Sequence, residues 1–253
     1  MQGSHGLDAL AFDAPPVDAT TLSVRFDQSA HILSSQLAPL QASWLADLPN
    51  VEEHPPDVDW LVKPDASAGN VWPLPATTFT SDDGSESVTL QEGLLEVAWV
   101  RGSDPYPGYA ALVGRLGKHF QELRDAMTTA GIEVTPRSSK CVYRNRLEAL
   151  SGGDAAVGVL TGWTGTPRAD LPAKGYVGVR IHACAGKGHH RCSSYVMVDA
   201  GTDDRTELTI SVTRKLREGE DSPLGGMQEA HEELLELFLR FTSQEQQEEW
   251  GRK

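Results

Sequence analysis

The sequence has few cysteines and no long apolar run, and each shortage excludes a class of protein. Three cysteines in 253 residues cannot form a disulfide framework, so we expect a reducing, cytoplasmic compartment. No run approaches the roughly 18 apolar residues that a membrane span needs. The first residues also lack the basic start and apolar core of a signal peptide. We therefore expect a protein that does not enter a membrane.

Basic residues are also scarce, because 22 Lys and Arg stand against 36 Asp and Glu, for a formal net charge of −14. This balance excludes a basic surface over the whole protein and leaves only a local patch for nucleic acid. Residues 1–60 hold nine acids and one basic residue, residues 217–253 hold ten and four, and residues 61–216 hold seventeen of each. Because chain ends often lie close together, we expect one acidic surface, which either keeps the protein soluble or attracts a basic partner.

The hydrophobic pattern predicts an α+β fold of antiparallel meander sheets, each followed by a long packed helix. The expected strands cover 17–27, 77–80, 87–91, 94–101, 132–147, 176–184, 192–199 and 207–217, and the expected helices cover 38–48, 109–130 and 226–249. A meander followed by a helix thus occurs twice, and the pattern allows the two similar units to form one compact body.

Composition also suggests where the chain divides. We expect a flexible lead-in over residues 1–14 and a first α+β unit over 15–150, which contains a Pro-rich connection at 49–76. A Gly-rich connector, interpreted as loop, follows at 151–175. The second meander and the C-terminal helix then form a unit over 176–253.

His182, Cys184, His190 and Cys192 flank a predicted turn at 186–188. With a three-residue loop, Cys184 faces His190 and His182 faces Cys192, so all four side chains share one face, as a tetrahedral zinc set requires. A loop of two or four residues turns the second pair to the other face. The alternatives are a Cys184–Cys192 pairing on oxidation and two ordinary half-exposed cysteines. We expect no resident cofactor, and zinc at this hairpin is the alternative.

Four basic residues fall within ten positions, at Arg137, Lys140, Arg144 and Arg146. In a strand, the last three share one face, because side chains alternate. Charges on an exposed strand often prevent edge pairing. The other interpretation is a local contact with an anion or a nucleic acid.

Two further groups are candidates for partner contacts. Trp99, Tyr106 and Tyr109 bracket a Pro-rich corner and form either a groove for a partner or part of the core. The second group is the set of glutamates on the final helix: Glu229, Glu232, Glu233 and Glu236. These belong to the acidic C-terminal end and would contribute to the acidic surface.

Signatures of catalysis are missing from the sequence, which has no nucleophile elbow, phosphate-binding loop or dinucleotide fingerprint. His119 and His231 lie beside or on apolar helical stripes, so we interpret both as core or interface residues. The sequence therefore favours a binding protein over an enzyme.

Several short motifs follow one another in a characteristic order: Pro15-Pro16-Val17, Val24-Arg25-Phe26, Asp82-Asp83-Gly84, Tyr106-Pro107-Gly108-Tyr109, Tyr143-Arg144-Asn145, Ala230-His231-Glu232 and Trp250-Gly251. In this order they resemble the TIGR04255 family, sporadically distributed bacterial proteins of uncharacterised function. The chain departs from the family at Ala98-Trp99-Val100, where the family tends to have Asn-Trp-Arg. The family's patchy occurrence implies an immunity, antitoxin or defence-accessory role instead of a metabolic one.

Together these features predict a cytoplasmic, non-enzymatic protein that uses an acidic surface to engage a basic protein partner. One alternative is an enzyme or small-ligand-binding protein, assisted by a metal at the 182–192 hairpin. Another is a structural subunit of an oligomeric assembly.

Overall fold

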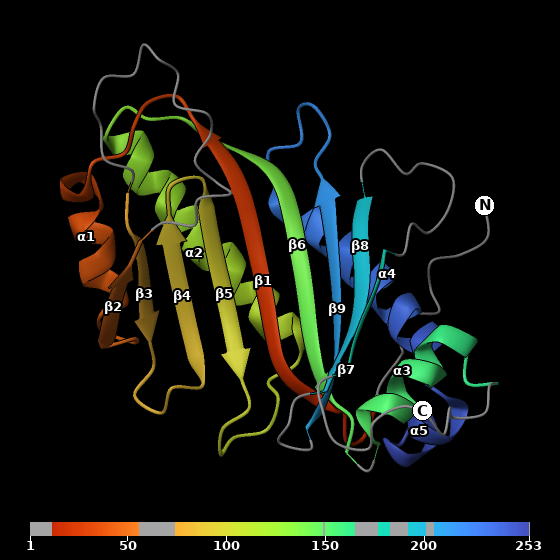
Figure 1. Ribbon diagram of the computed structural model, residues 1–253. Coiled ribbons are helices and arrows are strands. Elements are labelled where there is room, and N and C mark those ends of the chain that lie inside the picture. Colours follow the sequence, from red (N-terminus) through yellow and green to blue (C-terminus); the bar gives the residue numbers. More distant parts are fainter. Residues whose placement is uncertain are drawn as a thin grey trace. The chain divides into compact units, whose positions relative to one another are not determined.

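The computed structural model describes residues 12–55, 74–148, 150–164, 177–182, 192–200 and 205–252. Within these residues the architecture is α+β, as predicted, with an antiparallel sheet in the order β2-β3-β4-β5-β1-β6-β9-β8-β7 (Figure 1). The strands are β1 (Val17–Gln28), β2 (Asn50–His54), β3 (Ala76–Thr80), β4 (Glu86–Gln91), β5 (Leu94–Val100), β6 (Val134–Arg146), β7 (Val177–His182), β8 (Cys192–Ala200) and β9 (Thr206–Lys215). The helices are α1 (Ser34–Trp44), α2 (Tyr109–Thr129), α3 (Gly152–Thr161), α4 (Pro223–Phe241) and α5 (Gln244–Glu249).

The chain forms two compact units, each assembled from separated stretches. Unit 1 comprises Met1–Thr20, Lys140–Arg214 and Met227–Lys253, and unit 2 comprises Thr21–Ser139 and Lys215–Gly226. This grouping differs from the sequential division expected at residues 150 and 176, because β1 and β6 each contribute residues to both units.

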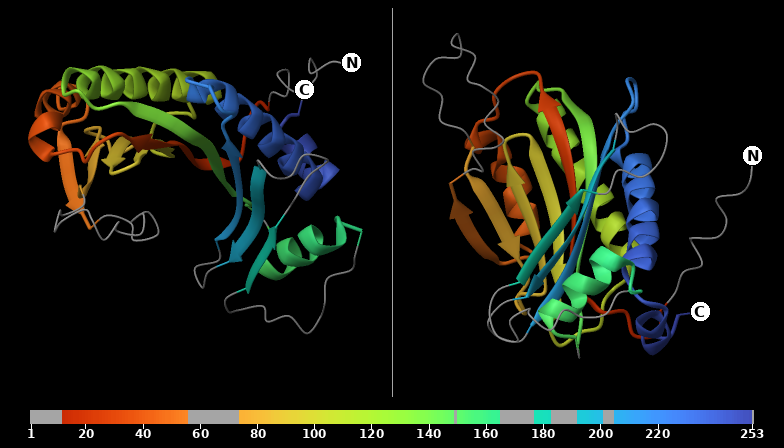
Figure 2. Two further views of the ribbon diagram at one scale, coloured as in Figure 1. Left: turned by 90° about the horizontal axis from the view of Figure 1, so that it is seen from above. Right: turned by 45° about the vertical axis from the view of Figure 1, so that its right-hand side comes forward.

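Unit 2 packs α2 against the meander β3–β4–β5, with α2 along one side of these strands (Figure 2). The apolar stripe predicted for this helix is buried: Leu112, Leu116, Phe120, Leu123 and Met127. Gly131 follows the helix with a φ of 74°, a left-handed conformation that glycine adopts without steric cost. The predicted meander and its helix are therefore confirmed.

The first helix begins earlier than its sequence predicts. Because proline favours a first turn, we expected a start near Ala38, yet α1 begins at Ser34 and contains Pro39. The ring of Pro39 removes the hydrogen bond that its N–H would donate to the carbonyl of Ser35. Ser35 is exposed, so water can bind that carbonyl instead.

Two segments interpreted as irregular contain regular structure. Residues 50–54 of the Pro-rich connection form β2, which pairs with β3 from Asn50↔Thr80 to His54↔Ala76. The Gly-rich connector contains α3, whose N-cap Ser151 accepts a hydrogen bond from the backbone N–H of Asp154 at 3.1 Å. Their proline and glycine content predicts loop, but pairing with a strand distant in sequence forms β2 and a local cap starts α3.

Unit 1 packs α4 and α3 on the same side of the strands β7, β8 and β9 (Figure 2). The covered side of these strands is apolar, and the contributing residues of β8, β9 and α4 are fully buried: Val196, Val198, Leu208, Ile210, Met227 and Leu234. The expected final helix over 226–249 is two helices, because Ser243 ends the α4 segment and caps α5 through its hydroxyl. α4 itself begins at Pro223, in the position where proline's missing N–H costs nothing.

Candidate functional site

The four glutamates of α4 do not share one environment. Glu229 and Glu236 are exposed and Glu232 is half-buried, whereas Glu233 is only 5% exposed. The spacing of Glu229, Glu232 and Glu236 places them on one stripe of the helix, opposite the buried apolar stripe. We call these three residues the outer α4 stripe.

Glu233 belongs to the interior of unit 1. Its Oε2 accepts a hydrogen bond from Nη2 of Arg214 on β9 at 2.5 Å, and the Arg214 side chain is itself only 24% exposed. A buried carboxylate needs such a partner, because removing an ion from water costs several kcal/mol. Glu233 therefore ties α4 to the sheet and does not face solvent.

The two ends of the chain meet within unit 1. Phe12 forms an isolated antiparallel bridge with Arg252, and the backbone N–H of Asp13 donates to the carbonyl of Gly251 at 3.3 Å. The Phe12 ring contacts Phe238 and Trp250 edge to face, at centroid distances of 5.5 and 6.5 Å. The expected meeting of the chain ends is thus seen at residues 12–14 and 250–252.

The acids of the two chain ends are divided between the units. Unit 1 holds Asp13 and the exposed acids of α5, which are Glu245, Glu248 and Glu249, together with the outer α4 stripe. Unit 1 also holds the half-buried Asp18 and the buried Glu233. Unit 2 holds the other described acids of the two ends: Asp27, Asp47, Glu52, Glu53, Glu218, Glu220 and Asp221. The acids near the two chain ends therefore belong partly to unit 1 and partly to unit 2.

The basic cluster alternates as the sequence predicts. Lys140, Arg144 and Arg146 are half-buried on one face of β6, whereas Cys141 and Tyr143 are buried on the other. Local acids lie close to three members of the cluster in the following pairs: Arg144 with Asp18 at 3.5 Å and with Glu207 at 3.8 Å, Arg146 with Glu148 at 3.7 Å, and Arg137 with Asp27 at 2.6 Å. These pairs join neighbouring segments, and a contact with an anion or a nucleic acid stays a prediction.

The aromatic corner lies in unit 2. Trp99 is 2% exposed, and its ring contacts Tyr106 edge to face at a centroid distance of 5.2 Å. Tyr109 is half-buried at the first position of α2. Trp99 therefore takes part in core packing, and a partner could reach only the half-buried tyrosines.

The described part of the Cys/His hairpin has a different register from the one that the zinc set requires. His182 of β7 pairs with Tyr195, and Cys192 of β8 pairs with Arg214 of β9. His182 and Cys192 are therefore not cross-strand partners. Cys184 and His190 lie outside the described residues. No group of three or more His, Cys, Asp or Glu side chains within the described ranges is placed to hold a metal, and zinc at this hairpin stays a prediction.

One partly buried cluster of Trp44, His119 and Glu122 joins α1 to α2. Nε1 of Trp44 donates to Oε2 of Glu122 at 2.8 Å, and Nδ1 of His119 lies 3.1 Å from the same oxygen. Burial lowers the pKa of His119 below its ordinary 6.5, against the opposing effect of the hydrogen bond to Glu122. The sequence predicts His119 as a core or interface histidine, and it carries no sign of Trp44 and Glu122 as its neighbours.

Cys141 is a poor candidate for a nucleophile. Its side chain is fully buried in β6, and burial raises the pKa of the thiol well above its usual range. The thiolate, which is the reactive form, is therefore suppressed at physiological pH. Cys141 contributes packing to unit 1, as a small apolar residue would.

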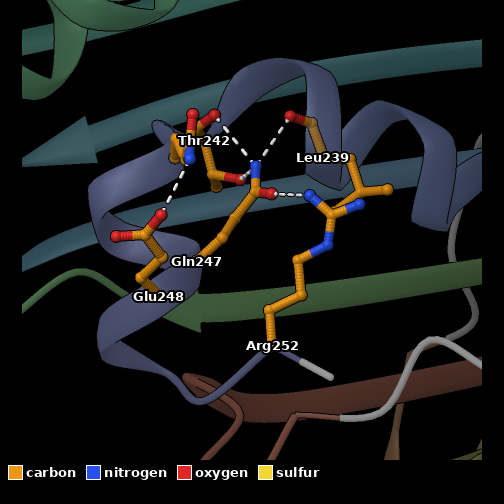
Figure 3. A pocket seen from close by; sticks show the side chains of 6 residues that line it. Leu239, Thr242, Gln247, Glu248 and Arg252 are labelled. Atoms are coloured by element: carbon orange, nitrogen blue, oxygen red, sulfur yellow. Dashed lines mark hydrogen bonds between the residues drawn. The ribbon is translucent and has the colours of Figure 1, made fainter.

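A hollow of about 480 Å³ lies where α4 meets α5, lined by Leu239, Thr242, Gln244, Gln247, Glu248 and Arg252 (Figure 3). Gln247 occupies its centre: Nε2 donates to the carbonyls of Leu239 and Thr242 at 3.0 and 3.2 Å, and Oε1 accepts from Arg252. The amide of Gln247 is thus occupied by groups of the chain itself. We interpret the hollow as the junction that fixes α5 on α4.

Comparisons with family models, curated proteins and solved structures find no match to this chain. The resemblance to the TIGR04255 family therefore stays a prediction. Within the described residues, no helix is both long enough and apolar enough to cross a membrane.

Proposed function

We propose that this chain is a non-enzymatic protein-binding component that engages a basic partner through the outer α4 stripe. The observation that carries the proposal is the contrast between adjacent residues of α4. Glu233 is buried against Arg214, whereas Glu229 and Glu236 are exposed and Glu232 is half-buried.

The physical effect of such a stripe is mainly steering and specificity. Exposed ion pairs contribute about 0.2–1 kcal/mol each, so three carboxylates add modest affinity. They also raise the association rate of a positively charged partner, and salt weakens this effect because the Debye length is about 10 Å at 0.1 M ionic strength. The acids of α5 and Asp13, in the same unit, carry charge of the same sign.

The test is capture of partners by the immobilised protein from an extract of its native cell, at several salt concentrations. The triple variant Glu229→Gln, Glu232→Gln and Glu236→Gln should lose the captured basic protein, as quantified by mass spectrometry. A matched variant with the same charge change, Asp82→Asn, Asp104→Asn and Glu133→Gln, should retain it, because none of these exposed acids belongs to the outer α4 stripe. Equal capture by both variants would contradict the proposal.

The finer proposal is that the partner is a toxin or another component of bacterial defence. It rests on the resemblance to sporadically distributed bacterial proteins, and the identity of the captured protein tests it. Capture of a metabolic enzyme alone would contradict this finer proposal while leaving protein binding itself in place.

A further inference from the structure

β2 is the end strand of the sheet order, and it differs from the other fully described strands in its exposure. All five of its residues are exposed, including Val51 at 44%. Every residue of β2 pairs with β3, so the backbone ladder holds the strand in place without burial of its side chains. Its other edge carries no strand among the described residues, and such an edge is a template for an added strand.

The register determines which backbone groups lie on that free edge. The N–H of Ser81 donates to the carbonyl of Glu86 at 2.9 Å, so these two residues form a hydrogen-bonded pair. Such pairs alternate along an antiparallel ladder, so Phe79↔Val88 and Thr77↔Leu90 are also hydrogen-bonded pairs between β3 and β4. Thr78 and Thr80 lie between these positions and direct their backbone N–H and C=O groups towards β2. Their β2 partners, Glu52 and Asn50, direct their own backbone groups towards β3. By alternation, Val51 and Glu53 present their N–H and C=O groups at the outer edge.

Prolines limit the length of this edge. Pro49 and Pro55 have the same parity as Val51 and Glu53, and neither has an N–H to donate. A pairing segment can therefore use the outward donors of Val51 and Glu53 only. β2 contains no lysine and no proline, the two residues that commonly block edge pairing. The available edge is short and is not blocked by its own residues.

The charge of β2 determines what can pair with it. Glu52 and Glu53 point to opposite faces of the strand, so a neighbouring strand meets a carboxylate on either face. In a second copy, the antiparallel register that pairs Val51 with Glu53 would place the two Glu52 side chains opposite each other. Like charges directly opposite are destabilising, whereas opposite charges are favourable. The edge therefore fits a basic strand better than a copy of itself.

We propose that the free edge of β2 binds a short, extended, basic segment of a partner protein, which adds to the sheet as a further strand. Backbone hydrogen bonds from Val51 and Glu53 supply the pairing, and Glu52 and Glu53 select for lysine or arginine. This surface belongs to unit 2 and its argument does not use the outer α4 stripe, so either proposal can fail alone.

The test is a titration of the isotope-labelled full chain with the peptide acetyl-Thr-Lys-Lys-Val-Thr-amide, in which the chemical shifts of the backbone amides are measured by NMR. The amides of Val51 and Glu53 should shift most and become protected from hydrogen exchange. Replacing both peptide lysines with glutamate should abolish these shifts. Shifts confined to residues outside β2 would overturn the proposal. So would movement of the same two amides with protein concentration alone, which would identify a second copy as the occupant.

Two matched changes separate strand addition from simple charge attraction. A peptide N-methylated at alternate residues on its pairing side keeps its charge but loses its donors, and it should bind at least tenfold more weakly. Val51→Pro should weaken binding of the unmodified peptide about fivefold to tenfold, because it removes an outward N–H. Val51→Thr, which keeps that N–H, should bind as the wild type does. Equal binding of the methylated and unmodified peptides would overturn the proposal, whatever Val51→Pro does to folding.

Discussion

The two long helices each bury one ionisable side chain, and they accommodate it differently. In unit 2, α2 buries His119 against Trp44 and Glu122, and burial favours its neutral form. In unit 1, α4 buries Glu233 in a direct ion pair with Arg214. His119 is therefore accommodated by staying neutral, whereas Glu233 stays charged and pairs with an opposite charge. The difference indicates that unit 1 should be sensitive to removal of a cation and unit 2 to pH.

The largest expected effect comes from removing the cation of unit 1. Arg214→Met should lower the free energy of unfolding by about 3 kcal/mol, because it removes the opposite charge that the buried Glu233 carboxylate pairs with. Urea unfolding followed by circular dichroism measures the change. Arg144→Met is the matched control: its pairs with Asp18 and Glu207 are longer and more exposed, so it should cost less than about 1 kcal/mol.

The double variant Arg214→Met with Glu233→Met sharpens this prediction. Removal of both charges leaves no buried ion, so most of the lost stability should return. If the double variant is as unstable as Arg214→Met alone, packing of the Arg214 side chain and not its charge stabilises unit 1.

A smaller effect is expected in unit 2 when the pH falls. The unfolded chain binds a proton at His119 near pH 6.5, whereas the folded chain does so only at lower pH, because burial lowers the pKa. Between these two values the unfolded state holds more protons. The stability that His119 contributes is therefore complete above pH 6.5 and is lost as the pH falls through that interval.

Urea midpoints measured between pH 7.5 and 5 check this prediction. His119→Gln should flatten this part of the pH dependence, since the variant has no imidazole to protonate. Lys118, Asp47 and Glu122 surround the ring and remain in both proteins, so the difference between the two curves isolates His119. Parallel curves would contradict the prediction.

The smallest effect is expected on the outer side of α4. Glu232→Gln should change the free energy of unfolding by less than about 0.5 kcal/mol, because the half-buried Glu232 accepts a hydrogen bond from Gln228 of its own helix that a glutamine can also accept. Glu233→Gln, one position along the same helix, should destabilise clearly, because it leaves the Arg214 guanidinium without its carboxylate. Equal stability of the two variants would remove the distinction between the outer α4 stripe and the buried glutamate.

Much of the fold could be predicted because its signals are local. Alternation along 134–146 correctly placed Lys140 and Arg144 on one face of a strand and Tyr143 on the other. The helical spacing of Leu112, Leu116 and the residues that follow likewise identified the buried stripe of α2. Each of these patterns repeats within a few residues, so no distant part of the chain is needed to detect it.

Other elements escaped prediction for two physical reasons. β2 has no buried face, so its residues show no alternation, and it exists because β3 lies 22 or more residues further along the chain to pair with it. α3 has a local signal in the cap formed by Ser151 and Asp154, and its end is marked by Gly162 in the left-handed conformation. The glycine content of this region predicts loop, although the residues that start and end the helix, Ser151 and Gly162, are both in the sequence.

The sequence by itself determined the total charge, the concentration of acids near the chain ends and the alternation of side chains within each element. Only the tertiary structure decided which acids remain on the surface. Glu232 and Glu233 are neighbours in sequence, yet β9 brings Arg214 to one and not to the other. Likewise, the folding of the chain into two units assigns some acids of its ends to one unit and some to the other. Burial and Coulomb energy depend on distance in space, and spacing along the chain does not encode that distance.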